Sequence, residues 1–156
     1  MLTAKKIRCL VIDDEPLARE MLKQHIAGVE SLELAGVCSN AIEATNFLKD
    51  HPVDLLFLDI QMPQLLGTNF IRTLKSPPKV IFTTAYRKYA VEGFELDAVD
   101  YILKPISLER FLKAINKVLQ TNLSSAQATN DSKENHTEPN RFLYFRVDRK
   151  MVKVLL

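Results

Sequence analysis

The polar side chains that could do chemistry stand directly after short apolar runs of the chain. Asp13 and Asp14 follow the first run, Asp59 follows a second, Thr84 a third and Lys104 a fourth. If these runs are parallel strands, their carboxyl ends lie at one edge of a sheet, where α/β proteins bind ligands. Three carboxylates in one cleft repel one another unless a cation neutralises them. The spacing therefore predicts a charged, cation-dependent site.

The types of side chain at this predicted site favour Mg²⁺ and phosphoryl chemistry. An oxygen-only ligand set without His or Cys suits Mg²⁺, which keeps water ligands and shares its shell with phosphate oxygens. Lys104 supplies a second positive charge. A carboxylate beside Mg²⁺ and an ammonium group is suited to receive a phosphoryl group, because catalysis there is mostly positioning and charge neutralisation.

Each residue taken alone also has a purely structural interpretation. Asp14 could cap a helix that starts at Pro16, since an Asp at a strand end is more often a cap or turn former than a ligand. Thr84 could be an ordinary strand-end threonine and Lys104 a solvated loop lysine. Tyr101, in the last apolar run, could be a core aromatic. The coincidence of polar residues at four strand ends favours a functional site.

The apolar runs that must position these residues fit strands buried on both faces. They are Cys9–Ile12, Leu34–Val37, Leu55–Leu58, Val80–Phe82 and Ala98–Ile102. Helical periodicity lies between and after them, with Pro16, Asn40 and Ser107 at expected helix starts and weaker helices around Phe70 and Val91. Five strands alternating with five helices predict a doubly wound α/β parallel sheet.

The 156-residue chain divides into three parts by composition and charge. Residues 1–120 carry 15 basic and 15 acidic side chains, so nothing suggests that this part binds nucleic acid by electrostatics. Residues 121–140 are rich in Ser, Thr and Asn and predict a flexible linker. Residues 141–156 carry five basic side chains against one acid and alternate like a β-hairpin. We expect this last segment to begin a β-rich domain.

The lengths of the apolar runs indicate whether the chain could enter or cross a membrane. No stretch approaches 18 uncharged apolar residues, so the sequence predicts no membrane span. The apolar run near the N-terminus ends in acidic residues and is too short for a signal peptide. We therefore expect a cytoplasmic protein that does not associate with membranes.

Four motifs in order along the chain resemble the receiver domain of bacterial two-component response regulators. They are Asp13–Pro16, Asp59–Pro63 with Gly67, Thr83–Ala85 and Asp100–Pro105. The resemblance covers roughly residues 5–120 and implies a flavodoxin-like sheet with strand order 2-1-3-4-5. It implies that the chain accepts a phosphoryl group from a sensor histidine kinase and forms a homodimer when phosphorylated.

The resemblance also implies roles for the acidic residues and their neighbours. Asp59 would be the phosphoacceptor and contribute to the Mg²⁺ site. Asp14 would ligate Mg²⁺ directly, Asp13 would bind it through water, and Gln61 would ligate it through its backbone carbonyl. Lys104 would contact the phosphoryl group.

Two further residues would form the switch that the resemblance implies. The Thr84 hydroxyl would move toward the phosphoryl group, and the Tyr101 ring would move inward in response. The implied chemistry is limited to Mg²⁺-dependent self-phosphorylation from a phosphodonor and slow autodephosphorylation, so we do not expect an enzyme with a separate substrate.

A second set of motifs is similar to receivers of the LytTR (LytR/AlgR-type) group. They are Thr84–Tyr86, Tyr89–Val91, Phe94–Glu95 and Ala98–Ile106. This similarity implies transcription regulation through an attached β-rich DNA-binding domain, cut off shortly after residue 141. DNA would be bound only by the full-length protein, because a basic hairpin alone cannot supply sequence-specific readout.

Other classes of protein fit these residues less well. A haloacid-dehalogenase-type phosphatase needs a second aspartate two residues after the first, and that position is Gln61. A flavodoxin-like electron carrier needs a phosphate-cradling loop after its first strand, where Asp13, Asp14 and Glu15 would repel a phosphate. Glycine-rich nucleotide-binding motifs are excluded because the four glycines are scattered.

Overall fold

The computed structural model describes residues 5–86 and 97–128, with side chains described in 5–86 and 97–121. Residues through Val118 form one compact unit, which carries the fold discussed below. The helix expected around Val91 and the segments expected after residue 128 lie outside the described residues. None of the helices in the described ranges is long and apolar enough to cross a bilayer.

Five parallel strands form a single sheet in the order β2-β1-β3-β4-β5. They are β1 (Ile7–Ile12), β2 (Leu32–Cys38), β3 (Leu55–Asp59), β4 (Lys79–Thr84) and β5 (Asp100–Leu103). The chain moves outward from β1 to β2 and then returns to place β3 on the other side of β1. The strand order therefore reverses between β1 and β3, which is where doubly wound sheets bind ligands. The predicted sheet and its order are confirmed.

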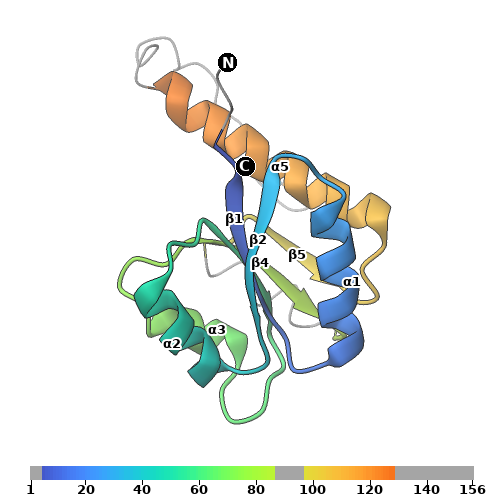
Figure 1. Ribbon diagram of the computed structural model, residues 1–156, viewed down its shortest axis with the longest axis vertical. Helices are drawn as coiled ribbons and strands as arrows, with labels where there is room; N and C mark the ends of the chain where they lie inside the picture. Colours follow the sequence, from blue (N-terminus) through green and yellow to red (C-terminus); the bar gives the residue numbers. More distant parts are fainter. Residues whose placement is uncertain (1–4, 87–96, 129–156) are drawn as a thin grey trace, which may run out of the picture. The chain divides into compact units, whose positions relative to one another are not determined.

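Helices cover both faces of this sheet. They are α1 (Pro16–Ala27), α2 (Ala41–Asp50), α3 (Gly67–Arg72) and α5 (Leu108–Ala128). Figure 1 shows α2 and α3 on one face and α1 and the first turns of α5 on the other. The described part of the chain therefore contains four of the five expected helices.

The helix starts that the sequence predicts are confirmed where side chains satisfy backbone N–H groups. Asn40 accepts a hydrogen bond from the Glu43 N–H at 2.9 Å and so caps α2. Ser107 accepts one from the Arg110 N–H at 3.1 Å at the start of α5. Pro16 occupies the first turn of α1, where the missing N–H has no intrahelical partner to lose.

The residue that caps the N-terminus of α1 is not the one that the sequence suggested. The N-cap is Glu15 rather than Asp14, so the interpretation of Asp14 as the cap of this helix is wrong. The Glu15 N–H instead donates to Asp13 Oδ1 at 2.9 Å. A turn of the chain after β1 thus directs three consecutive acidic residues toward the carboxyl edge of the sheet.

The core forms two apolar layers, one on each side of β3, whose five residues are all buried. On one side, Phe82 and Leu58 pack with Phe70 of α3 in a cluster of buried residues. On the other side, Phe57 stacks on Phe111 of α5, with ring centroids 5.5 Å apart. Burial on both faces explains why the strands read as continuous apolar runs.

Some element ends differ from their predicted positions. The helix predicted around Phe70 to Leu74 ends at Arg72, and the Thr73 hydroxyl donates to the Phe70 carbonyl at 2.6 Å. Pro77 and Pro78 follow shortly afterwards and cannot continue a helix. The boundary expected at residue 120 falls inside α5, which is helical through residue 128.

Gly67 begins α3 in close contact with the end of β3. Its N–H donates to the Ile60 carbonyl at 2.8 Å. A Cβ atom added at this position would collide with the backbone carbonyl of Asp59 and lie 3.1 Å from the Ile60 Cα. The absence of a side chain at Gly67 therefore allows the backbone that carries Asp59 to keep its position.

We expect Gly67→Ala to lower the free energy of unfolding by about 1–3 kcal/mol, because the added methyl group must displace backbone. Gly28→Ala is the matched control, since a Cβ there lies 3.6 Å from its nearest neighbour, the His25 carbonyl oxygen. The control should stay within about 0.5 kcal/mol of the parent. Urea denaturation measures both, and a Gly67→Ala protein as stable as the parent would contradict the close approach.

Candidate functional site

The carboxyl edge of the sheet brings together the polar residues that the sequence singled out. Asp13 directly follows β1, Asp59 ends β3, Thr84 ends β4 and Lys104 directly follows β5. The register places Asp59 beside Thr83 of the neighbouring strand. The Lys104 N–H also donates to the Thr84 carbonyl at 2.7 Å, so the lysine is anchored to the end of β4.

Three carboxylates form the centre of this site. Asp13, Asp14 and Asp59 each offer one carboxylate oxygen, and these atoms lie within 4.8 Å of one another. Asp13 and Asp59 are buried, whereas Asp14 is exposed. Asp13 Oδ2 is buried and has an ion pair with Lys104 Nζ at 3.0 Å, but among the described residues it accepts no well-aligned hydrogen bond. A buried carboxylate oxygen in this condition, within an all-oxygen cluster, fits a hard divalent cation such as Mg²⁺.

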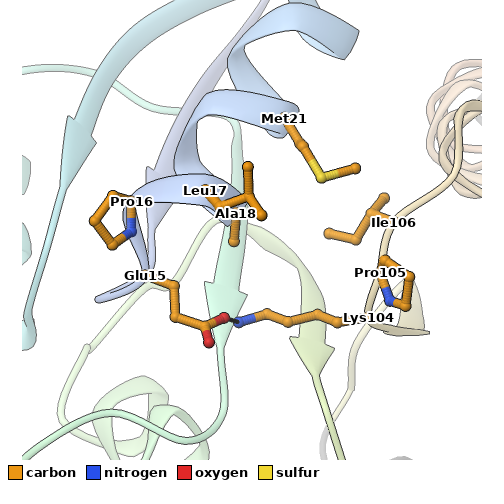
Figure 2. Close-up of a pocket in the computed structure, with 8 residues that line it drawn as sticks. All are labelled: Glu15, Pro16, Leu17, Ala18, Met21, Lys104, Pro105 and Ile106. Carbon is orange, nitrogen blue, oxygen red and sulfur yellow. Dashed lines mark hydrogen bonds and ion pairs between the residues drawn. The ribbon is translucent and has the colours of Figure 1, made fainter.

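The Lys104 ammonium group is the positive charge closest to these carboxylates among the described residues. Its Nζ lies 3.0 Å from Asp13 Oδ2 and 3.4 Å from Asp59 Oδ2. It lies 2.6 Å from Glu15 Oε1, and Figure 2 shows this ion pair as a dashed line. The Lys104 side chain is only 12% exposed, so these ion pairs are partly shielded from water.

The environment of Asp59 disfavours its charged form. Burial and the nearby Asp13 carboxylate raise the pKa of Asp59 to about 7. The Lys104 ammonium and the Gln61 N–H, which donates to Asp59 Oδ1 at 3.1 Å, lower this pKa but offset only part of the rise. A nucleophilic carboxylate at Asp59 therefore benefits from additional positive charge, which a bound divalent cation would supply.

The same cluster of carboxylates favours the charged form of Lys104. Burial alone would lower the pKa of Lys104, but its hydrogen bonds to Glu15 and Asp13 raise it further than burial lowers it. The ammonium group therefore stays protonated beside Asp59. The site thus combines the positive charge of Lys104 with a surplus of negative charge.

Thr84 ends β4, and Tyr101 lies on the adjacent strand β5, in register with Phe82. Thr84 is buried, and its Oγ1 accepts a hydrogen bond from the Tyr86 N–H at 3.0 Å. The Tyr101 ring is buried and stacks on Phe82, with ring centroids 5.4 Å apart. A core aromatic and a switch residue in its inward position would both look like this, so the switch role of Tyr101 stays a prediction.

An ion cluster that the sequence did not single out holds α5 against β5. Arg110 donates to both carboxylate oxygens of Asp100, at 2.8 and 2.9 Å, and to the Tyr101 carbonyl at 2.9 Å. Lys117 Nζ lies 3.1 Å from Asp100 Oδ1. Burial alone would raise the pKa of Asp100, but Arg110 and Lys117 lower it below its ordinary value. The available signal was an aspartate inside an otherwise apolar run.

Glu15 is the other residue that sequence reasoning left without a role. Its ion pair with Lys104 joins residues 89 positions apart, which no local pattern reveals. The available signal was its type, since glutamate is not a preferred residue at a helix N-cap.

A mainly apolar groove opens beside Lys104, between the start of α1 and the loop after β5. Its volume is about 310 Å³, and Figure 2 shows the residues that line it. They are Glu15, Pro16, Leu17, Ala18, Met21, Lys104, Pro105 and Ile106. Leu17 is 72% exposed at its edge, so the groove presents apolar surface to solvent next to the charged site.

The part of the chain that forms the sheet and its acidic site is similar in sequence to known proteins. Residues 9–116 match the family described as response regulator receiver domain. The chain is 41% identical over 116 residues to the transcriptional regulatory protein BtsR of Salmonella typhimurium, covering 73% of the chain and 48% of that protein. It is 41% identical over 115 residues to the sensory transduction protein LytR of Staphylococcus haemolyticus, covering 72% and 45%. The chain thus spans about half the length of the curated relatives it matches.

One solved structure is similar to this chain in both sequence and fold. The response regulatory domain of protein mrkE from Klebsiella pneumoniae superposes with a TM-score of 0.67 at 33% identity, covering 74% of this chain and 97% of that one. The family match extends over well more than half of the chain, and it contains the carboxyl end of every strand that carries the acidic site. The chain therefore belongs to the receiver domain family of two-component response regulators.

Proposed function

We propose that Asp59 accepts a phosphoryl group from the phosphohistidine of a sensor histidine kinase, and that this change switches the receiver. The observation that carries the proposal is the position of the buried Asp59 carboxylate. Its oxygens lie close to those of Asp13 and Asp14, and its Oδ2 is 3.4 Å from Lys104 Nζ. A nucleophile surrounded by cation ligands and an ammonium group suits phosphoryl transfer.

The proposed transfer forms one bond and breaks another. An Asp59 carboxylate oxygen attacks phosphorus as the bond to the histidine nitrogen of the kinase breaks, which gives an acyl phosphate. Lys104 would contact the new phosphoryl oxygens. Water later attacks phosphorus, breaks the bond to Asp59 and releases inorganic phosphate. We propose that the chemistry is confined to these two steps, with no separate substrate turned over.

The proposed Mg²⁺ ligands come from the same cluster. Asp14 would ligate directly and Asp13 through water, while Asp59 and the backbone carbonyl of Gln61 would complete the protein ligands. When bound, Mg²⁺ would supply positive charge to the phosphoryl oxygens as they become more negative. The buried Oδ2 of Asp13, which lacks a well-aligned hydrogen-bond donor among the described residues, and the all-oxygen composition of the cluster support this ligand set.

We expect Asp59→Asn to abolish phosphorylation without loss of the fold, because an amide keeps the size of the side chain but lacks a nucleophilic oxygen anion. The protein is incubated with Mg²⁺ and acetyl phosphate, and intact mass spectrometry measures the gain of one phosphoryl group. The parent should gain it and Asp59→Asn should not.

Asp54→Asn is the matched control for this experiment. Asp54 directly precedes the same strand at its opposite end, where it is exposed and accepts a hydrogen bond from the Arg8 N–H at 2.9 Å. This variant should be labelled like the parent. Labelling of Asp59→Asn at the parental level would refute Asp59 as the phosphoacceptor.

The proposed switch begins at Thr84. Because its hydroxyl oxygen accepts the Tyr86 N–H, its hydroxyl proton can be donated to a phosphoryl oxygen on Asp59. Such a bond would reorient Thr84 and change the chain that follows β4. We propose that this change favours the inward position of the Tyr101 ring. It would also strengthen a homodimer, by as much as the phosphorylated and unphosphorylated receivers differ in their affinity for a second copy.

We expect Thr84→Ala to accept a phosphoryl group yet to dimerise no better when phosphorylated. Thr83→Ala is the matched control, because the neighbouring residue of a strand faces the opposite side of the sheet. Analytical ultracentrifugation with and without acetyl phosphate measures the dimer in the parent and both variants. Phosphorylation that strengthens the dimer equally in Thr84→Ala and the parent would remove the support for this coupling.

The kinase and the output domain are also part of the proposal. The apolar groove beside Lys104 is a surface through which a kinase could approach Asp59. We assign residues 1–120 to the receiver, 121–140 to a linker whose first eight residues continue α5, and 141–156 to the start of a LytTR-type DNA-binding domain in a longer transcription regulator. The relatives described as transcriptional regulatory protein BtsR and sensory transduction protein LytR support this assignment.

A further inference from the structure

Glu15 occupies a position where a different kind of side chain is expected. It is the N-cap residue of α1, with φ −93° and ψ 120°. N-caps favour Ser, Thr, Asp and Asn, whose short side chains accept hydrogen bonds from the first turn of the helix. The Glu15 side chain makes no such bond with α1. It extends away from the helix and reaches the Lys104 ammonium group after β5 (Figure 2).

The Lys104 ammonium group already donates two hydrogen bonds, to Glu15 Oε1 at 2.6 Å and to Asp13 Oδ1 at 3.3 Å. A lysine ammonium has three N–H donors and no acceptor. Three carboxylates lie around Nζ, with Glu15 at 2.6 Å, Asp13 at 3.0 Å and Asp59 at 3.4 Å. The oxygens of a phosphoryl group on Asp59 would therefore compete with Glu15 and Asp13 for the N–H donors of this ammonium group.

Burial indicates which carboxylate can withdraw. The Asp13 and Asp59 side chains are 0% and 3% exposed and are held by the packed ends of their strands. The Glu15 side chain is 58% exposed and has three rotatable bonds, so it can leave Lys104 and be hydrated. Release of a carboxylate into water is far less costly than leaving one buried without a partner.

We infer that Glu15 is a positioning residue that holds Lys104 in the unphosphorylated receiver and releases it when a phosphoryl group forms on Asp59. This inference rests on the proposed function of Asp59. The Glu15–Lys104 ion pair exists in only one of the two states, so it stabilises the unphosphorylated state relative to the phosphorylated one. Glu15 thus sets how readily the receiver becomes activated.

The inference gives a direction for the effect of removing Glu15. A variant without the ion pair should bind a phosphoryl mimic more tightly, because Lys104 no longer has to exchange a partner. Exposed ion pairs contribute modestly, so the affinity should rise about two- to five-fold. A merely structural role of Glu15 at the helix start would alter thermal stability but leave this affinity unchanged.

Fluoroberyllate in saturating Mg²⁺ is the probe, since it binds an aspartate carboxylate in the geometry of a phosphoryl group. Isothermal titration calorimetry measures its dissociation constant for the parent, Glu15→Gln, Glu15→Asp and Glu20→Gln. Glu20 is a matched control on α1, where its Oε1 lies 3.6 Å from the Nζ of Lys23 in an exposed ion pair. Thermal unfolding without fluoroberyllate measures the stability of each protein.

We expect Glu15→Gln to bind fluoroberyllate two- to five-fold more tightly and Glu20→Gln to bind it like the parent. Glu15→Asp keeps the charge but is one methylene shorter and cannot keep the 2.6 Å contact. It should therefore also bind more tightly than the parent.

Two results would overturn the inference. Unchanged or weaker binding by Glu15→Gln would mean that Glu15 does not compete for Lys104. Parental binding by Glu15→Asp, with tighter binding by Glu15→Gln, would mean that negative charge near the site acts without the contact. Failure of the proposed function is a separate result, because the parent itself would then neither bind fluoroberyllate nor gain a phosphoryl group.

Discussion

Asp13, Asp14 and Asp59 hold carboxylate oxygens within 4.8 Å of one another, and the repulsion among them is the constraint on which the rest of the site depends. The raised pKa of Asp59 is the direct consequence of this repulsion and of burial. Lys104 offsets part of it from the end of β5, and a divalent cation would offset the remainder. In our proposal a phosphoryl group on Asp59 would add further negative charge, and the groups that balance it would have to change position.

The fold allows this concentration of charge because the rest of the sheet is apolar and tightly packed. The reversal of strand order between β1 and β3 places Asp13 and Asp59 side by side, and Gly67 leaves room for the backbone of Asp59. Arg110 fixes α5 to β5 at Asp100 and the Tyr101 carbonyl. The stable framework thus surrounds a small charged region that can respond to phosphorylation.

The sequence predicted the features that depend on neighbouring residues in the chain, namely the buried strands and the helix starts. Continuous apolar runs such as Leu55–Leu58 indicated buried parallel strands, and Asn40 and Ser107 indicated helix starts through their capping side chains. Parallel topology then placed the acidic residues at one edge. The ion pairs of Lys104 with Glu15 and of Arg110 with Asp100 could not be predicted in this way, because each depends on how two elements meet in space.

Mg²⁺-dependent stability of the parent and of Asp14→Ala tests most directly whether carboxylate repulsion is balanced by a bound cation. Thermal unfolding is measured in chelator and in Mg²⁺, with Na⁺ at equal ionic strength as the control. Mg²⁺ at ten times its dissociation constant should stabilise the parent by about 1.4 kcal/mol. Asp14→Ala should exceed the parent in stability without metal, because one repelling charge is gone, and should respond less to Mg²⁺. A parent that does not respond to Mg²⁺, together with a less stable Asp14→Ala protein, would contradict a cation site at this edge of the sheet.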